Sequence, residues 1–293
     1  MSESAAQPKP PPLRFGIVRN QNLPLPQLQR SWAFFEGLGF DSIWHADHFQ
    51  RPSVPEHPFL EGWTLLAHMA TRTESARIGL LVTSNTFRDP ALVAKQAVTV
   101  DHASGGRLEL GLGTGWWEPE HRAYGLPFPE PKELVDRFEE ALEVVTALLG
   151  GDTVSYEGRY YRLQDAQFRP RSLQPRIPLT LGAHGPRMLR IVARFADRWN
   201  SYGTVGEIRE RSARLDEACA AAGRDPDEIL RSLYGWTLKL GADPWSSPEA
   251  FADIVGRYTE VGVREFLMEA PHEAQFATTE RIAREVIPGL RAA

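Results

Sequence analysis

Short apolar segments alternate with amphipathic ones along most of the chain. Residues 13–18 (LRFGIV) form an apolar run typical of a strand, and residues 25–38 carry apolar side chains at helical spacing until Gly39 ends the segment. The same rhythm continues to residue 290. Continuous apolar runs such as RIGLLVT at 77–83 are typical of parallel strands buried on both faces. The pattern therefore predicts an α/β protein made of repeated strand–helix units.

The units are numerous enough to indicate a particular architecture. About eight units in roughly 250 residues match a closed (β/α)8 TIM barrel. A doubly wound open sheet is the main alternative, but the chain shows no midchain linker or change of composition. The expected strands are 13–18, 41–46, 77–83, 108–112, 177–181, 197–202, 230–240 and 265–269. The expected helices are 25–38, 61–71, 90–102, 131–149, 186–195, 205–222, 248–262 and 279–290.

Two segments depart from this rhythm. Residues 153–168 (TVSYEGRYYRLQDAQF) alternate around Glu157 and Gly158, which predicts a β-hairpin insertion after the fourth βα unit, at about 152–170. Residues 1–12 are rich in Ala, Gln and Pro and are expected to form a disordered leader. The remaining residues, 13–293, are expected to form one domain.

Composition narrows the range of partners and locations. The formal net charge is -5 and no Lys/Arg run occurs, so we expect neither nucleic acid nor an anionic membrane surface as a partner. No apolar run approaches the roughly 18 residues that span a bilayer, and no apolar signal core is present, so we expect a cytoplasmic protein. The single cysteine, Cys219, excludes an internal disulfide. No HExxH or Cys–His cluster occurs, and no metal site is expected.

The stretch GRLELGLGTGWWEPEH, residues 106–121, joins a strand to a glycine-rich loop. Its glycines could let the backbone approach a flat ring or an oxyanion, although an ordinary tight turn is the alternative. We expect Trp116, Trp117 and the following Glu-Pro to exclude a helix directly after the glycines, which argues against a Rossmann phosphate loop. The two tryptophans could wall an apolar substrate pocket, or could be buried against a partner subunit.

In a barrel, chemistry belongs at the C-terminal ends of the strands. Asp47 and His48 fall at such an end, and His48 is a candidate acid or base, with a loop histidine satisfied by its neighbours as the alternative. The segment LGAHGPR opens a helix, where backbone N–H groups favour phosphate, with an ordinary strand-to-helix turn as the alternative. Arg187 and Arg190 could add charge there or only solvate the helix. The segments expected to converge on one mouth are 47–48, 83–85, 114–116 and 183–185.

Five segments, in this order, resemble the bacterial luciferase-like superfamily, and more closely its branch that uses the deazaflavin coenzyme F420. They are FDSIWHADHF, RIGLLVTSNTFRDPALVAKQ, SGGRLELGLGTGW, YEGRYYRL and LGAHGP. The resemblance implies that Asp47 and His48 bind the coenzyme, with His48 facing its ring and acting as acid or base. FMN-dependent luciferases more often have an acidic residue followed by two histidines at this place, so ADHF favours deazaflavin.

The resemblance also implies further contacts with the coenzyme. A non-prolyl cis peptide at Leu81-Val82 is expected to back the ring, and Ser84 to contact the coenzyme. The segments expected near the ribityl chain and phosphate are Thr114-Gly115 and Ala183-His184-Gly185, in which His184 replaces a common glycine. Trp116 stands where the sugar-phosphate dehydrogenases of this branch have an acidic residue, which argues against sugar-phosphate oxidation.

The resulting hypothesis is an F420-dependent oxidoreductase that transfers hydride between deazaflavin and a small organic substrate, in a pocket shaped by Trp116 and Trp117. Two alternatives stay open: an FMN-dependent monooxygenase of the same fold, and a non-catalytic barrel that carries a coenzyme or a partner subunit. The resemblance also implies a homodimer, for which the apolar helices around 63–69 and 93–100 are the expected interface.

Overall fold

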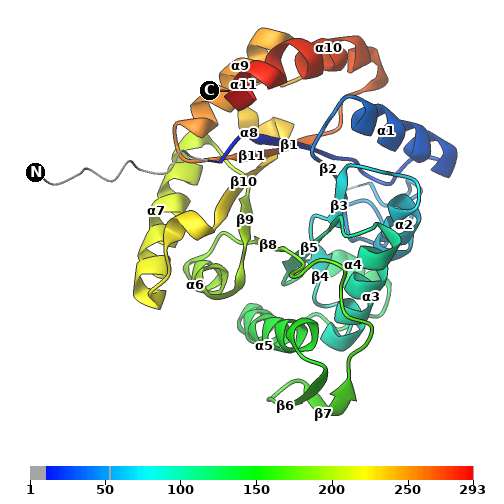
Figure 1. Cartoon of the computed structure of the whole chain (residues 1–293), viewed down its shortest axis with the longest axis vertical. Coiled ribbons are helices and arrows are strands. Elements are labelled where there is room, and N and C mark those ends of the chain that lie inside the picture. The colour runs from blue at the N-terminus through cyan, green and yellow to red at the C-terminus, as the bar shows by residue number, and fades with distance from the viewer. Residues whose placement is uncertain (1–10, 53, 293) are drawn as a thin grey trace, which may run out of the picture.

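Parallel strands close into an eight-stranded barrel in the computed structural model (Figure 1). One of the eight consists of two consecutive short strands, so nine strands are named below. The structure describes residues 11–52 and 54–292, so most of the expected disordered leader lies outside the described residues. β3 pairs with both β2 and β5, which closes the ring and confirms the predicted TIM barrel. The strands of the barrel are β1 (Arg14–Val18), β2 (Ser42–His45), β3 (Arg77–Leu80), β4 (Thr83–Ser84), β5 (Leu108–Gly113), β8 (Leu179–Gly182), β9 (Arg198–Ser201), β10 (Leu230–Gly235) and β11 (Glu265–Glu269).

Helices surround the strands, as Figure 1 shows. Local signals set several of their ends: Asp89 caps the start of α3 by accepting from the Ala91 N–H, and Gly223 ends α7 with a φ of 67°. The helices are α1 (Leu25–Gly37), α2 (Gly62–Ala70), α3 (Pro90–Ala103), α5 (Pro131–Gly150), α6 (Pro186–Phe195), α7 (Val205–Ala222), α9 (Pro248–Thr259), α10 (Phe276–Arg281) and α11 (Ile287–Ala292), the last two joined by a π-helical segment (Ile282–Val286).

The predicted hairpin is present as β6 (Thr153–Glu157) and β7 (Arg162–Gln167), which form a separate antiparallel sheet. It lies beyond α5, on the side away from the barrel (Figure 1). The Glu140 carboxylate of α5 accepts N–H groups of Tyr160 and Tyr161 in the turn, at 2.9 and 2.7 Å. The hairpin is therefore held against α5 by its turn.

Three sequence predictions were wrong in detail. The strand expected at 77–83 is broken between β3 and β4, where the chain bulges. The segment after Trp117, expected to exclude a helix, forms the short helix α4 (Glu118–Ala123); Pro119 is tolerated because a first-turn N–H has no partner inside a helix. The strand expected at 230–240 ends at Gly235, and α8 (Thr237–Leu240) follows it.

The expected subunit interface on α2 and α3 stays a prediction, although the apolar side chains that suggested it do not reach the surface. The apolar side chains of α2 and α3 that suggested it are buried in this chain's own core. Trp63, Leu66 and Met69 are at most 2% exposed, and Val93 and Val98 at most 3%. These side chains have no surface to offer a second copy, and the homodimer stays a prediction without this argument.

Charged side chains fill the N-terminal end of the barrel. Glu109 of β5 lies 3.0 Å from Arg14 and also pairs with Arg77 and Arg198, and its side chain is fully buried. The Arg198 Nε lies 2.8 Å from an Oε of Glu265, and burial lowers the pKa of Arg198 to about 10. This ion layer closes one end of the barrel, so the other end is available for a ligand.

Candidate active site

The opposite end of the barrel, where β2, β4, β5 and β8 end, is called the mouth below. It is shaped by a bulge between β3 and β4, in which the Leu81-Val82 peptide bond is cis, at the predicted position. Leu81 packs against the inward-facing group of Val18, Trp44 and Leu267.

Glycines on the neighbouring strands make room for the bulge. A Cβ at Gly113 would lie 2.6 Å from Val82 Cγ2, and one at Gly182 would lie 3.6 Å from the same atom. A Cβ at Gly111 would collide with the Leu80 carbonyl oxygen. From the sequence, the glycines of this stretch could either approach a ligand or form a tight turn; in the structure, Gly111 and Gly113 accommodate the backbone and side chains of the bulge.

His48, the candidate acid or base, is held at the mouth by α4. Its Nδ1 lies 2.8 Å from Glu120 Oε2. The other oxygen of Glu120 accepts the N–H groups of Phe49 and Gln50, at 2.7 and 3.0 Å. A carboxylate only accepts, so His48 donates through Nδ1, and among the described residues its Nε2 has no hydrogen-bond partner. The Glu120 side chain is fully buried and that of His48 is 15% exposed.

Trp116 and Trp117 flank His48, as the substrate-pocket hypothesis requires. Their rings stand nearly perpendicular to the imidazole, with centroids 5.8 and 6.2 Å away. Trp116 is 66% exposed, whereas Trp117 is half-buried. The pair therefore forms an apolar wall beside the imidazole, whose Nε2 has no hydrogen-bond partner in the described part of the chain.

Asp47 has a different role from His48. Its buried carboxylate accepts two N–H groups of Arg88, at 2.6 and 2.9 Å, and the Ser84 N–H, at 2.8 Å. Glu61 contacts the same guanidinium. Burial opposes the charge of Arg88, but Asp47 and then Glu61 raise its pKa. Asp47 therefore joins the end of β2 to β4 and positions Ser84, and its carboxylate is already satisfied by protein donors.

Ser84 and Gly115 lie against each other at the ends of β4 and β5. A Cβ at Gly115 would lie 2.8 Å from Ser84 Oγ and 2.6 Å from Thr86 Oγ1, and the φ of Gly115 is 83°. Both constraints require glycine at this position. Thr114 turns its hydroxyl to the Gly115 carbonyl oxygen, at 3.0 Å. The predicted residues of these two strands are therefore brought together.

The predicted phosphate segment lies at the end of β8. The Ala183 carbonyl accepts from Trp199 Nε1 at 2.9 Å, so this carbonyl is already used. The His184 ring packs edge-on against Tyr202, with centroids 4.4 Å apart. Burial, and to a lesser extent Arg211, lowers the pKa of His184 to about 4, so the ring is neutral near pH 7. Gly185 precedes the first turn of α6, whose N–H groups have no partners within the helix.

Arg187 does not add a free positive charge to the predicted phosphate segment, because it pairs with carboxylates of α5. Its guanidinium lies 2.5 Å from Asp136 and 3.3 Å from Glu139, both on α5. These two carboxylates compensate its charge. An anion at α6 would thus be bound by backbone N–H groups and the helix dipole rather than by Arg187.

A second polar pair lies inside the mouth, at the ends of β10 and β11. Tyr234 donates its hydroxyl to Glu269 at 3.0 Å, and Glu269 also accepts the Thr237 N–H at 3.0 Å. Tyr234 packs against the same inward-facing group as Leu81. Burial, followed by the nearby Glu269, raises the pKa of Tyr234, which keeps its hydroxyl protonated.

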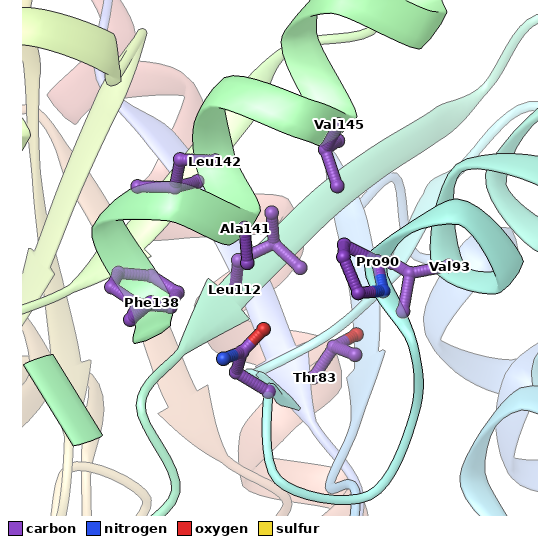
Figure 2. Close-up of a pocket in the computed structure, with 9 residues that line it drawn as sticks. Thr83, Pro90, Val93, Leu112, Phe138, Ala141, Leu142 and Val145 are labelled. Carbon is purple, nitrogen blue, oxygen red and sulfur yellow. The ribbon is translucent and has the colours of Figure 1, made fainter. Parts of the chain in front are cut away.

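A small cavity lies outside the mouth, between the barrel and α5. Figure 2 shows side chains of α5, among them Phe138 and Ala141, facing Thr83 and Pro90 across it. Its volume is about 10 Å³, enough for roughly one water molecule. The cavity is a packing gap next to the bulge and is too small for a substrate.

Sequence reasoning missed Glu120, His121 and Thr86. The segment EPEH places a carboxylate and a histidine side by side after two tryptophans, which was the available signal. It was overlooked because no helix was expected there and because His121 was tested only for metal-ligand spacing.

In the described ranges, no group of three or more His, Cys, Asp or Glu side chains could hold a metal ion. No helix in the described part of the chain has the length and apolarity to cross a membrane.

Comparisons with known proteins agree with this geometry. A family model described as luciferase-like monooxygenase matches residues 13–280. An F420-dependent glucose-6-phosphate dehydrogenase of Intrasporangium calvum is 31% identical, over 87% of this chain and 92% of that protein. A phthiodiolone/phenolphthiodiolone dimycocerosates ketoreductase of Mycobacterium bovis is also 31% identical, over 86% of this chain and 72% of that protein.

A solved structure shares the fold. The F420-dependent secondary alcohol dehydrogenase in complex with an F420-acetone adduct matches with a TM-score of 0.83, covering 96% of this chain and 99% of its own. The two sequences are 18% identical, so this likeness supports the barrel alone.

Proposed function

The chain belongs to the luciferase-like monooxygenase family, and from this premise we propose that it is a coenzyme F420-dependent oxidoreductase. The reaction is hydride transfer between the deazaflavin and a small organic substrate. An F420-dependent relative that spans nearly the whole chain supports this function. The observation that carries the proposal within the structure is the position of His48, which Glu120 holds through Nδ1 beside an apolar wall, while no described residue bonds to its Nε2.

The residues of the mouth fit the coenzyme. Leu81 and Val82 offer an apolar surface against which a flat ring can lie, next to strands that glycine keeps free of side chains. Gly115 allows the backbone after β5 to come close to the ribityl chain. The first turn of α6, preceded by neutral His184 and by Gly185, would hold the phosphate.

A bound deazaflavin would supply hydride chemistry at its C5 carbon, and the protein would donate or accept the proton of the substrate oxygen. In ketone reduction, His48 in its charged form donates from Nε2 to the substrate oxygen; in alcohol oxidation, neutral His48 accepts that proton. Glu120 keeps the imidazole ring oriented through its contact with Nδ1. Trp116 and Trp117 exclude water from the reacting oxygen.

We further propose an apolar ketone or alcohol as the substrate class. Two relatives of equal identity are named for very different substrates, so identity does not choose between them. The local chemistry supports an apolar substrate: Trp116 and Trp117 stand beside His48, and Arg88, a cation near this part of the mouth, is compensated by Asp47 and Glu61.

Oxygen consumption separates this function from the FMN-dependent alternative, which the name of the matched family keeps in view. Purified protein is supplied with reduced F420 or reduced FMN, each with a panel of apolar ketones. Anaerobic oxidation of reduced F420 by a ketone, without oxygen uptake, is the expected result. Substrate-dependent oxygen uptake with FMN alone would overturn it. Coenzyme binding without turnover on any substrate would favour the non-catalytic barrel.

His48→Ala tests the acid–base assignment. We expect turnover to fall by about 10²- to 10⁴-fold while F420 still binds. Unchanged turnover with normal binding would refute the role of His48.

We also propose a cytoplasmic homodimer. A monomeric mass by light scattering at micromolar concentration would contradict the dimer.

A further inference from the structure

A chain of hydrogen bonds runs from a buried histidine to the rim of the mouth. His121 of α4 is 1% exposed. Its Nδ1 lies 2.9 Å from the Trp117 carbonyl oxygen, and its Nε2 lies 2.6 Å from Thr86 Oγ1. Thr86 Oγ1 lies 2.7 Å from Ser84 Oγ. Three side chains are therefore linked in series, with Ser84 at the end nearest the predicted coenzyme site.

The direction of each hydrogen bond in this chain, from donor to acceptor, follows from His121. A carbonyl oxygen only accepts, so His121 must donate through Nδ1, which leaves Nε2 of the neutral ring as an acceptor. The Thr86 hydroxyl then donates to Nε2, because that nitrogen carries no proton. The single hydroxyl proton of Thr86 is used in the bond to His121, so the Ser84 hydroxyl donates to Thr86 Oγ1. Ser84 Oγ is left with lone pairs and no free proton.

We propose that His121 is a positioning residue that makes Ser84 an obligate hydrogen-bond acceptor toward the coenzyme. Ser84 then selects an N–H or O–H donor, as offered by the deazaflavin ring or its ribityl hydroxyls, and disfavours an acceptor at the same place. This inference rests on the proposed function for the identity of the ligand. The polarity of the chain itself does not depend on any ligand.

Two further contacts fix Ser84 in this arrangement. Its backbone N–H donates to Asp47 at 2.8 Å, which fixes the backbone that carries the hydroxyl. Gly115 lies over both hydroxyls and leaves no space for a side chain above them. The imidazole of His121 is enclosed by the Phe87 and Phe128 rings, with centroids 4.9 and 4.7 Å away.

The tautomer of His121 tests the first step in the protein without coenzyme. Long-range ¹H–¹⁵N correlation spectra at about pH 8.5, where free histidine is neutral, distinguish the two neutral tautomers. The inference requires a proton on Nδ1, and this signal should disappear in His121→Gln. A proton on Nε2 would overturn the inference even if F420 binds as proposed.

Coenzyme affinity tests the second step through a double-mutant cycle. Thr86→Val keeps the shape but removes the relay, and we expect the F420 dissociation constant to rise about fivefold. Thr86→Ser retains a hydroxyl and should restore binding. In a Ser84→Ala background, Thr86→Val should change the dissociation constant by less than about twofold, because the effect acts through Ser84.

Thr99→Val, which removes an exposed hydroxyl from α3, is the matched control and should leave affinity unchanged. Equal losses from Thr86→Val with and without Ser84 would overturn the inference, as would wild-type affinity in Thr86→Val. Failure of F420 to bind the wild-type protein would refute the proposed function instead, and the tautomer result would still stand.

Discussion

The Nδ1 of His48 lies 2.8 Å from the buried Oε2 of Glu120, although 72 residues separate the two in the chain. Glu120 also accepts two backbone N–H groups from the loop that follows His48. One carboxylate thus fixes both the ring and the loop that carries it. By this geometry Glu120 orients the imidazole of His48, the candidate acid or base, and we expect it to act only through that ring.

Replacing this carboxylate should impair catalysis more than binding. In Glu120→Gln, the amide keeps the size of the side chain but replaces one of the two acceptor oxygens that hold His48 and the loop after it by an NH₂ donor. We expect kcat to fall by about 10- to 100-fold with little change in the F420 dissociation constant. Glu118→Gln is the control, because Glu118 lies on the same helix but is exposed and pairs only with Arg122. Equal kcat values for the two variants would contradict the assignment.

The pH dependence of stability should report His45. Burial lowers its pKa to about 4 from 6.5, since its ring lies in the core between Trp32 and the Arg19 carbonyl. The unfolded chain therefore binds more protons between these values, and stability is lost as the pH falls from 6.5 toward 4. The expected loss is about 3 kcal/mol.

Urea unfolding at about pH 7 and pH 4 measures this contribution. His45→Gln should show a smaller difference between the two conditions than the wild-type protein, whereas His57→Gln, an exposed replacement, should behave like the wild type. An identical pH dependence in His45→Gln would show that His45 does not titrate in this way.

Removal of an unused hydroxyl should stabilise the protein. Thr83 is fully buried beside the small apolar cavity (Figure 2), and its Oγ1 has no hydrogen-bond partner within residues 11–52 and 54–292. Thr83→Val should raise the free energy of unfolding by about 1 kcal/mol. Thr180→Val, at an equally buried site where the hydroxyl accepts from Arg198, should lower it. Destabilisation by Thr83→Val would indicate that a water molecule in the cavity bonds to Thr83.

The ion layer at the closed end of the barrel should matter for stability and not for chemistry. Glu109→Leu leaves Arg14, Arg77 and Arg198 without their shared carboxylate, and we expect the free energy of unfolding to fall by about 3–5 kcal/mol. Glu133→Gln breaks an exposed pair with Arg137 and should cost less than about 1 kcal/mol. A loss below about 1 kcal/mol for Glu109→Leu would contradict the role of the layer.

Much of the fold could be predicted from the sequence because each βα unit carries its own local signal. Apolar strands, Asp89 before Pro90, and Gly223 after α7 indicate their elements within a few residues. The resemblance to a known family added the cis peptide at Leu81-Val82, which no local propensity indicates. Contacts between distant segments were not accessible in this way.

The contacts of the site that join distant segments could not be predicted from local sequence patterns. Glu120 and His121 are adjacent in sequence, yet one binds His48 and the other leads to Ser84 through Thr86. Trp116, Trp117 and Pro119 suggested a loop, and a six-residue helix is too short to show a periodic pattern. Likewise, Asp47 looked like a partner of the coenzyme until its three protein donors were seen.

The most direct test of the central claim is titration of the purified apoprotein with F420 and, separately, with FMN, following the fluorescence of each coenzyme. The account predicts saturable quenching of F420 and far weaker binding of FMN. Preference for FMN would contradict it in favour of the monooxygenase, and binding of neither would leave the barrel without the coenzyme on which the account depends.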